Sequence, residues 1–377
     1  MYHHSTKKKR LLIDVNSVIP YFQHGHTTGV GRSTLELISA MSKLGSLPFE
    51  LTLYTQNTRG ISIKGHIPLK EFHLYLSNKA PVRRIVNALH LKWLFTQYDL
   101  LHIPHNTDYC ETFGKTIFTI HDLIVYRYPE MWGATEREMN KYRNIGHRCK
   151  AIITCSDASK EDIVRFWNVP ENKVTTIHWG INRDVFHPTA DVDFLKSLGI
   201  TMPYFFSASC NHPRKNTPML LEAFRRYLEK GGSRQLVLLS PATDDLKKYE
   251  DLMKKQQVVT CKDISDQQLA TLYTNAHCTA ITSAYEGFGL PILESLACGT
   301  PVISARNSSL TEIGKKTIDY FAELNEECIS EKLLQVCRID KAQLLDKAQT
   351  ENHLQSFSWQ QCAEKYVETY ERLLYQK

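Results

Sequence analysis

Short apolar runs with the composition of strands alternate with longer amphipathic segments along much of the chain. Residues 10–15 (RLLIDV) are typical of a buried strand, and residues 31–44 then place leucine, isoleucine and methionine at helical spacing. Alternation of this kind favours a parallel sheet covered by helices on both faces. Further strands are expected at residues 51–54, 100–103, 116–120, 151–154 and 174–177.

The same alternation begins again near residue 203. A strand at 203–208 is followed by a helical segment at 218–228 and another strand at 235–239. Two doubly wound units side by side explain this restart most simply. The remaining expected elements are helices at 244–255, 266–274 and 291–297 and strands at 258–259 and 278–281.

The length of 377 residues allows two domains of ordinary size. We place the first domain at residues 1–187 and the second at residues 188–357. Residues 358–377 form a last, amphipathic helix in this prediction.

Composition narrows the class of protein. Hydrophobic residues make up 42% and charged residues 23% of the chain, as in ordinary soluble proteins. No apolar run approaches the ~20 residues that a bilayer-spanning helix needs. The ten cysteines include no C-x-x-C pair, which favours reduced thiols and predicts a cytoplasmic protein.

The charge is unevenly distributed, since residues 1–188 carry 24 Lys and Arg against 16 Asp and Glu. The first half of the chain should therefore meet any anionic partner. No nucleic-acid motif accompanies this charge.

One segment says most about function: residues 283–294, SAYEGFGLPILE. Glycines on either side of Phe288 permit a sharp turn, and Pro291 suits the first turn of a helix, which places Glu294 in that turn as well. A strand, a tight loop and a helix N-terminus in this order can bind a phosphate. Glu286 and Glu294 can accept hydrogen bonds from hydroxyl groups, so phosphate and polyol together suggest a nucleotide-sugar.

The spacing from Glu286 to Glu294 resembles the E-x7-E signature of retaining glycosyltransferases of family 4, and residues 296–303 (LACGTPVI) continue the family pattern. The resemblance implies the GT-B architecture: two Rossmann-like, doubly wound α/β domains that face a central cleft. It gives the first domain the acceptor side and the second the nucleotide-sugar donor side. It also implies that the terminal helix crosses back to the first domain.

The resemblance assigns roles in the second domain. Residues 213–216 (PRKN) are similar to a family motif in which Arg214 and Lys215 bind the diphosphate and stabilise its departure. Glu286 would contact the transferred sugar and Glu294 the ribose. The donor-binding loop would consist of Gly287, Phe288, Gly289 and Leu290. Glu312 matches a weaker family pattern, because Thr311 replaces the expected proline.

In the first domain, residues 28–33 (TGVGRS) do not complete a dinucleotide fingerprint, since Thr34 occupies the third glycine position. They resemble the family loop in which Gly29, Gly31 and Arg32 face phosphate or acceptor. His121, in the pair His121-Asp122 after a predicted strand, resembles the family histidine that approaches the sugar. The expected catalytic residues are His121, Glu286, Arg214 and Lys215.

We expect no cofactor beyond the donor and no obligatory metal. Asp191-Val192-Asp193 has the D-x-D form of a metal motif, but it lies in the connection between the domains. Arg214, Lys215 and a helix N-terminus can offset the diphosphate charge instead. The family implies retention of anomeric configuration. No carboxylate stands out as a nucleophile for double displacement, so front-face transfer is the alternative.

Residues 126–130 (YRYPE) resemble family members that use GDP-mannose, which favours that donor, while UDP-glucose and UDP-N-acetylglucosamine stay open. The acceptor would be a glycan or lipid-linked glycan of a surface polysaccharide. Residues 79–95 mix cations, aliphatics and Trp93, as a helix on an anionic membrane does, although a core helix with a basic face explains them equally well. The protein would then be cytoplasmic or peripheral on the inner face of the membrane.

Two other functions compete with transfer. A nucleotide-sugar-binding subunit without activity need not keep all of Glu286, Glu294, Arg214, Lys215 and His121. A nucleotide-sugar epimerase of the same fold would act without an acceptor, and the loop at residues 29–32 together with residues 287–291 favours transfer over it.

Overall fold

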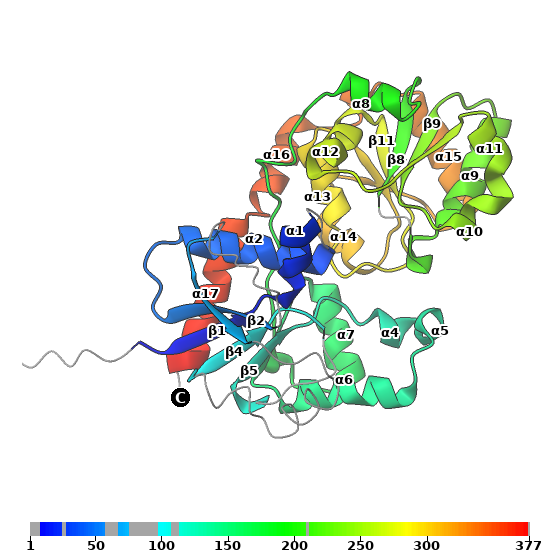
Figure 1. Cartoon of the computed structure of the whole chain (residues 1–377). Helices are drawn as coiled ribbons and strands as arrows, with labels where there is room; N and C mark the ends of the chain where they lie inside the picture. The colour runs from blue at the N-terminus through cyan, green and yellow to red at the C-terminus, as the bar shows by residue number, and fades with distance from the viewer. Residues whose placement is uncertain are drawn as a thin grey trace, which may run out of the picture. The chain divides into compact units, whose positions relative to one another are not determined.

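The structure is a computed structural model that describes residues 8–24, 28–56, 67–74, 97–106, 113–208 and 211–375. The chain divides into two compact units (Figure 1). The first comprises Met1–Gly180 and Trp359–Lys377, and the second Ile181–Ser358. The division between the units therefore comes at residue 180, where the sequence suggested residue 187.

The first unit contains a parallel sheet of seven strands in the order β3-β2-β1-β4-β5-β6-β7. This is the doubly wound arrangement that the alternating sequence predicts. The central strands β4, β5 and β6 are buried along their whole length, which explains their continuous apolar runs. The strands are β1 Arg10–Asp14, β2 Glu50–Gln56, β3 Lys70–Leu74, β4 Leu100–Ile103, β5 Thr116–Thr119, β6 Ala151–Thr154 and β7 Val174–Thr176.

Helices begin where polar side chains can cap them. Thr28 accepts a hydrogen bond from the Gly31 backbone at the start of α2, and Ser156 accepts one from Ser159 at the start of α7. Thr135 and Glu138 form a capping box at the start of α6. Among the described residues, the helices of this unit are α1 Ile19–His24, α2 Gly29–Lys43, α4 Ile124–Arg127, α5 Pro129–Trp132, α6 Glu136–Arg148, α7 Asp157–Trp167 and α17 Trp359–Tyr375.

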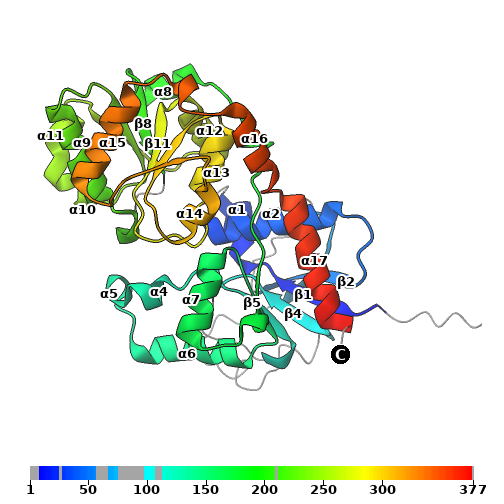
Figure 2. The ribbon, with the colours of Figure 1, turned by 180° about the vertical axis from the view of Figure 1, so that it is seen from behind.

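The terminal helix α17 belongs to the first unit, although the chain reaches it from the second (Figure 2). It packs on α2. Its Tyr366 hydroxyl lies 3.2 Å from Oγ1 of Thr119, and its Tyr370 hydroxyl lies 2.7 Å from Nδ1 of His102. All four side chains are buried, so the helix is fixed to the sheet by polar bonds as well as by apolar contact.

The second unit has a parallel sheet of six strands in the order β10-β9-β8-β11-β12-β13, which confirms the second doubly wound fold. In both sheets the strand order reverses beside the first strand of the unit, between β1 and β4 and between β8 and β11. The strands are β8 Tyr204–Ser207, β9 Gln235–Leu239, β10 Val258–Cys261, β11 Cys278–Ile281, β12 Val302–Ser304 and β13 Asp319–Tyr320.

One expected helix of this unit is broken. Residues 244–255 form α10 Thr243–Leu246, a 3-10 turn and α11 Glu250–Lys254 in place of one helix. The break directs the buried Tyr249 toward Pro218 and Glu222, with which its hydroxyl forms hydrogen bonds. The other helices are α8 Val192–Ser197, α9 Thr217–Glu229, α12 Asp266–Asn275, α13 Leu290–Ala297, α14 Ser308–Gly314, α15 Glu326–Cys337 and α16 Lys347–Gln355.

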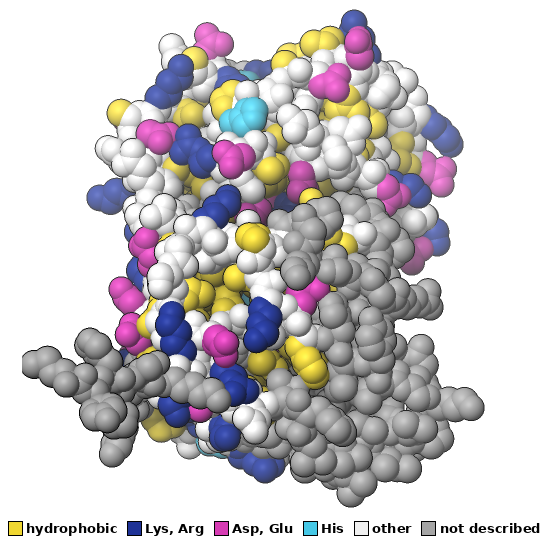
Figure 3. All heavy atoms as spheres, turned by 60° about the vertical axis from the view of Figure 1, so that its left-hand side comes forward, with side chains coloured by type: hydrophobic (Ala, Val, Ile, Leu, Met, Phe, Trp, Pro, Cys, Tyr) yellow, Lys and Arg dark blue, Asp and Glu magenta, His cyan; other side chains and the backbone are white. Residues whose placement is uncertain are grey.

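Other sequence expectations can be placed on this fold. Within the described ranges, no helix is both long and apolar enough to span a bilayer. All eight cysteines whose state the structure gives are free thiols. On the face shown in Figure 3, the described Lys and Arg side chains are interspersed with Asp and Glu. The segment 79–95, considered above as a membrane helix, lies outside the described residues.

Candidate functional site

The reversal of strand order in the second unit brings together two of the predicted motifs. Parallel doubly wound sheets bind ligands at the carboxyl ends of the strands, at this reversal. Arg214 and Lys215 lie in a 3-10 turn after β8, and Glu286 lies in the loop after the neighbouring strand β11. The two loops are joined by hydrogen bonds from Asn216 Nδ2 to the Thr282 carbonyl (3.0 Å) and from Thr282 Oγ1 to the Lys215 carbonyl (2.8 Å).

The Glu286 carboxylate is the centre of this cluster. Arg214 Nη1 donates to its Oε2. Lys215 Nζ lies 2.5 Å from Oε1, and Ser283 Oγ donates to the same oxygen at 2.6 Å. Burial alone would raise the pKa of Glu286, but Lys215 and Arg214 outweigh it and hold the pKa at about 2. One carboxylate between two cations leaves the cluster with a net positive charge, which suits an anion.

The backbone of Glu286 is held by residues that the sequence did not indicate. Its N–H donates to Ser308 Oγ at 3.0 Å, and its carbonyl accepts from Ser309 Oγ at 2.8 Å. Both serines begin α14, after β12, the next strand along the sheet. The signal for Ser283 was its position two residues after the predicted strand at 278–281. The contacts of Ser308 and Ser309 depend on strand order and have no local signal.

Glu294 lies on α13 with its side chain buried. The expectation that it occupies the first turn of this helix is wrong. Gly289 ends the loop with a φ of 106°, so α13 begins at Leu290, before the proline, and Glu294 is in the second turn. Its Oε2 accepts a hydrogen bond of 2.7 Å from the hydroxyl of Tyr273, another residue that the sequence analysis did not select.

The rest of the predicted donor loop is largely buried. The Phe288 ring packs edge-on against Phe357 with their centroids 6.1 Å apart. Gly287 and Gly289 are also buried, and Leu290 is half-buried at the start of α13. At Gly289 an added Cβ would come within 3.2 Å of Leu310, and its positive φ disfavours any other residue. Glu312, from the weaker motif, is half-buried in α14.

His121 of the first unit follows β5 and is buried. Its Nε2 donates to the Pro104 carbonyl at 3.0 Å, and its backbone N–H donates to Oδ1 of Asn106 at 3.1 Å. Burial lowers the pKa of His121 to about 4, although the bond to Pro104 opposes the shift. The imidazole is therefore neutral at pH 7, with its proton on Nε2 and a lone pair on Nδ1.

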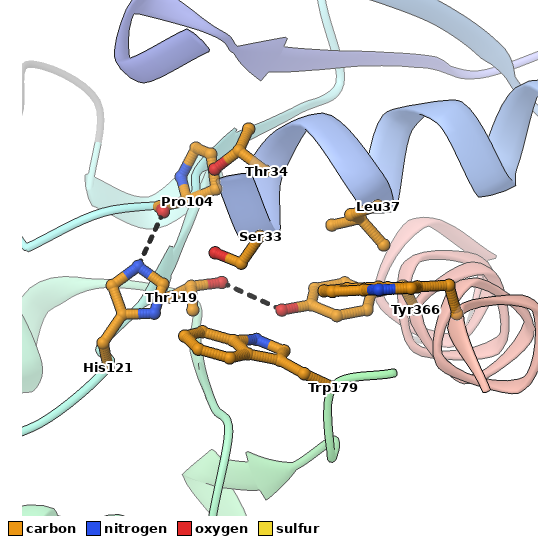
Figure 4. A pocket seen from close by; sticks show the side chains of 9 residues that line it. Ser33, Thr34, Leu37, Pro104, Thr119, His121, Trp179 and Tyr366 are labelled. Atoms are coloured by element: carbon orange, nitrogen blue, oxygen red, sulfur yellow. Dashed lines mark hydrogen bonds between the residues drawn. The ribbon is translucent and has the colours of Figure 1, made fainter. Parts of the chain in front are cut away.

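The backbone carbonyl of His121 is already engaged, since it accepts from Ser159 Oγ at 3.0 Å and Cys155 Sγ at 3.3 Å. The Nδ1 atom is buried and has no hydrogen-bond partner among the described residues. Figure 4 shows this nitrogen on the side of the ring that faces Thr119. The small cavity there is lined by Ser33, Thr34, Leu37, Pro104, Thr119, His121, Trp179, Trp359 and Tyr366.

The helix expected at residues 31–44 contains Gly31 and Arg32 and begins two residues earlier, at Gly29. These three residues occupy the first turn of α2, which begins at Gly29 because Thr28 supplies the cap. Gly31 is buried and Arg32 half-buried. An added Cβ at Gly29 would meet no atom within 4 Å, so close packing does not require glycine there.

The remaining sequence motifs have local structural roles. Asp191 of the D-x-D stretch caps α8 by accepting from the Phe194 N–H at 2.9 Å. Residues 126–130 span the end of α4 and the start of α5. Arg127 there pairs with the buried Asp162 of α7 at 3.0 Å.

Two family profiles together match most of the chain. The profile described as "Glycosyltransferase Family 4" matches residues 27–185, and the one described as "Glycosyl transferases group 1" matches residues 197–348. The "O-antigen chain mannosyltransferase B" of Escherichia coli is 25% identical over 92% of this chain and 96% of its own length. The chain covers 66%, 57% and 50% of the length of three other curated relatives.

Solved structures share the whole fold at low sequence identity. The sucrose-phosphate synthase of Thermosynechococcus elongatus has a TM-score of 0.74 and 18% identity over 97% of this chain and 99% of its own. Anabaena Alr3699/HepE, solved with UDP-glucose, has a TM-score of 0.70 and 16% identity over 96% of this chain and 99% of its own. Both family profiles, the full-length relative and the two doubly wound sheets agree: the chain belongs to the glycosyltransferases of family 4 and has the GT-B fold.

Proposed function

We propose that the protein transfers mannose from GDP-mannose to a glycan or lipid-linked glycan acceptor during synthesis of a surface polysaccharide. The observation that carries the proposal is the buried Glu286 carboxylate with Arg214 and Lys215 at the carboxyl ends of β8 and β11. Two cations held there can bind a diphosphate and stabilise its departure as a leaving group.

The choice of mannose and of a surface polysaccharide rests on relatives. The E. coli protein that matches nearly the whole chain is an O-antigen chain mannosyltransferase. The stretch at residues 126–130 favours the same donor. UDP-glucose remains the main competitor because Alr3699/HepE was solved with it.

We further propose that the anomeric configuration is retained by front-face transfer, in which the departing phosphate takes the acceptor proton. Glu286 is a poor nucleophile because both of its carboxylate oxygens accept hydrogen bonds and its pKa is about 2. The protein then acts by positioning and electrostatics. His121, neutral and with a free lone pair on Nδ1, is proposed as the residue of the first unit that acts on the transferred sugar.

No metal is required in this proposal, because Arg214 and Lys215 supply the positive charge. The protein is proposed to act in the cytoplasm or at the inner face of the membrane.

The test is a panel of GDP-mannose, UDP-glucose and UDP-N-acetylglucosamine, scored by thermal shift and by slow hydrolysis without acceptor, each with and without EDTA. We expect GDP-mannose to stabilise the protein by about 2.7 kcal/mol at a hundred times its Kd. NMR of the first-formed sugar product should show the α-anomer of the donor. A rise in unfolding temperature with UDP-sugars alone would overturn the donor assignment. Binding of a nucleotide-sugar without hydrolysis would favour a non-catalytic subunit. Loss of activity in EDTA would overturn the proposal that no metal is required.

A further inference from the structure

The cavity beside His121 has the size and the polar lining of a site for one water molecule. Its volume of about 10 Å³ is near the smallest that holds a water. We propose that a buried water in this cavity accepts a hydrogen bond from the Tyr366 hydroxyl and donates one to Nδ1 of His121. Tyr366 is then a positioning residue, through which the terminal helix α17 orients the His121 imidazole, whichever donor the protein uses.

The His121 ring presents a hydrogen-bond acceptor to the cavity. Its Nε2 donates to the Pro104 carbonyl at 3.0 Å, so the lone pair of the neutral ring is on Nδ1. That nitrogen is buried without a hydrogen-bond partner among the described residues, and Figure 4 shows it on the side of the ring toward Thr119. Buried polar atoms nearly always have a partner, either in the protein or in ordered water. A donor to Nδ1 is therefore expected in the cavity.

A chain of hydrogen bonds from α17 leads to the same cavity. The Tyr370 hydroxyl lies 2.7 Å from Nδ1 of His102. Nε2 of His102 lies 2.8 Å from Oγ1 of Thr119, which lies 3.2 Å from the Tyr366 hydroxyl. Burial keeps His102 neutral, so its ring has one N–H. This N–H and the three hydroxyls give four protons for three hydrogen bonds, which leaves one hydroxyl proton at an end of the chain.

The surroundings of the two tyrosines decide at which end that proton remains. Tyr370 is fully buried, and His102 is the one partner of its hydroxyl within the described part of the chain. Tyr366 instead lines the cavity (Figure 4). The arrangement in which every proton can find an acceptor therefore starts at Tyr370, which donates to His102. His102 then donates to Thr119 and Thr119 to Tyr366, so the Tyr366 proton is left for the cavity.

Ser33 of α2 supplies a third partner for the water. Its Oγ donates to the Val30 carbonyl at 2.9 Å and keeps its own lone pairs, and the side chain lines the cavity. A water that accepts from Tyr366 and donates to both His121 and Ser33 makes three hydrogen bonds, the usual number for a buried water.

The chain has a consequence for the His121 imidazole. A donor to Nδ1 stabilises the neutral ring, because protonation of Nδ1 would break that hydrogen bond. The bond from Nε2 to Pro104 and the bond from the water to Nδ1 together fix the ring at both nitrogens. A substrate group that binds Nδ1 must then displace this water.

The first experiment uses the unaltered full-length protein without substrate. A crystal structure should show one water within about 3.2 Å of Nδ1 of His121, Oγ of Ser33 and the Tyr366 hydroxyl. Nitrogen-15 NMR of the histidine rings at pH 7, assigned with His102→Gln and His121→Gln, should place the proton on Nε2 in both rings and show a hydrogen-bonded Nδ1 in His121. A cavity without water, or a proton on Nδ1 of His102, overturns the proposal.

The second experiment repeats both measurements on Tyr366→Phe, which removes the donor to the water. The matched control is Tyr126→Phe, because the Tyr126 hydroxyl belongs to the same unit and donates to the Met139 carbonyl, away from the cavity lining. We expect Tyr366→Phe to weaken the water density and to move the His121 Nδ1 signal toward that of an unbonded lone pair, while Tyr126→Phe changes neither.

Two results would overturn the role of Tyr366. The water and the His121 signal could be unchanged in Tyr366→Phe, which would show that α17 does not hold them. Equal changes in the two phenylalanine variants would instead show a general loosening of the first unit. If Tyr366→Phe does not fold, the position of the proton on His102 in the unaltered protein still decides whether the chain ends at Tyr366.

Discussion

The two units have the same doubly wound fold but differ in the chemistry at the carboxyl ends of their strands. In the second unit, Glu286 is ionised far below its usual pKa between Arg214 and Lys215. In the first unit, His121 is kept neutral by burial, with a pKa of about 4. The carboxyl ends of the strands thus carry three charged side chains in the second unit and an uncharged imidazole in the first.

The difference follows from what each loop places around its buried group. Glu286 faces two cations and Ser283, so the charged form is favoured in spite of burial. His121 faces a backbone carbonyl and the ring of Trp179, whose centroid is 5.2 Å away, and neither favours a charge on the imidazole enough to offset burial. Fold alone therefore does not decide what a site can do; the loop residues decide it.

The largest effect should come from removing a cation of the second unit. We expect Arg214→Ala to lower kcat by about 10²–10³-fold, the usual loss for one group that stabilises charge in the transition state. The matched control is Arg226→Ala, because Arg226 pairs with Glu327 at 3.1 Å on the exposed surface, where such pairs contribute about 0–1 kcal/mol. Turnover of GDP-mannose measures both. Equal activity in the two variants would contradict the diphosphate assignment.

The next prediction concerns the stability of the protein at low pH. The pKa of Glu286 is about 2 in the folded protein and near 4.5 in the unfolded chain, so its contribution to stability is complete above 4.5 and is lost as the pH falls toward 2. The contribution is at most about 3 kcal/mol. Urea unfolding at pH 7 and pH 3.5 should show that Glu286→Gln is less stable than the unaltered protein at pH 7, by a difference that shrinks at pH 3.5. A difference that is constant with pH would mean that the cations do not stabilise the ionised form.

Much of the fold of the two units, and part of the site, could be predicted from the sequence. The apolar runs of β4 to β6, and those of β8 and β11, are continuous because these strands are buried on both faces, and that pattern is local. Residues 286–294 carry their own signal in the spacing of two glutamates around a glycine-rich turn. The strand β3 (KEFHL) was not expected, since it lies at the edge of its sheet and is largely polar.

The hydrogen-bond partners of the site residues could not be predicted from the sequence. Tyr273, Ser308 and Ser309 reach the glutamates only because α12 and α14 pack against particular neighbours, and nothing near them in the sequence indicates this. The start of α13 was misjudged for a related reason. Pro291 indicated a helix start, but the left-handed Gly289 sets it one residue earlier. Contacts between segments distant in the sequence decide the partners of the two glutamates, and the left-handed backbone conformation of Gly289 decides where α13 begins.

The smallest effect should come from the uncharged hydrogen-bond network of the first unit, which is formed by His102, Thr119, Tyr366 and Tyr370. Tyr370 bonds to Nδ1 of His102, whose pKa burial lowers to about 3, so no charge is involved at neutral pH. Tyr370→Phe should destabilise the protein by about 1–2 kcal/mol, the cost of one buried hydrogen bond, equally at pH 7 and pH 8. The control is Tyr375→Phe on the same helix, where an exposed side chain donates to the Pro48 carbonyl at 2.9 Å and little should be lost. Urea unfolding measures both variants. A loss in Tyr370→Phe that changes between pH 7 and pH 8 would show that this network carries a titrating charge, and the contrast between a neutral first unit and a charged second unit would then fail.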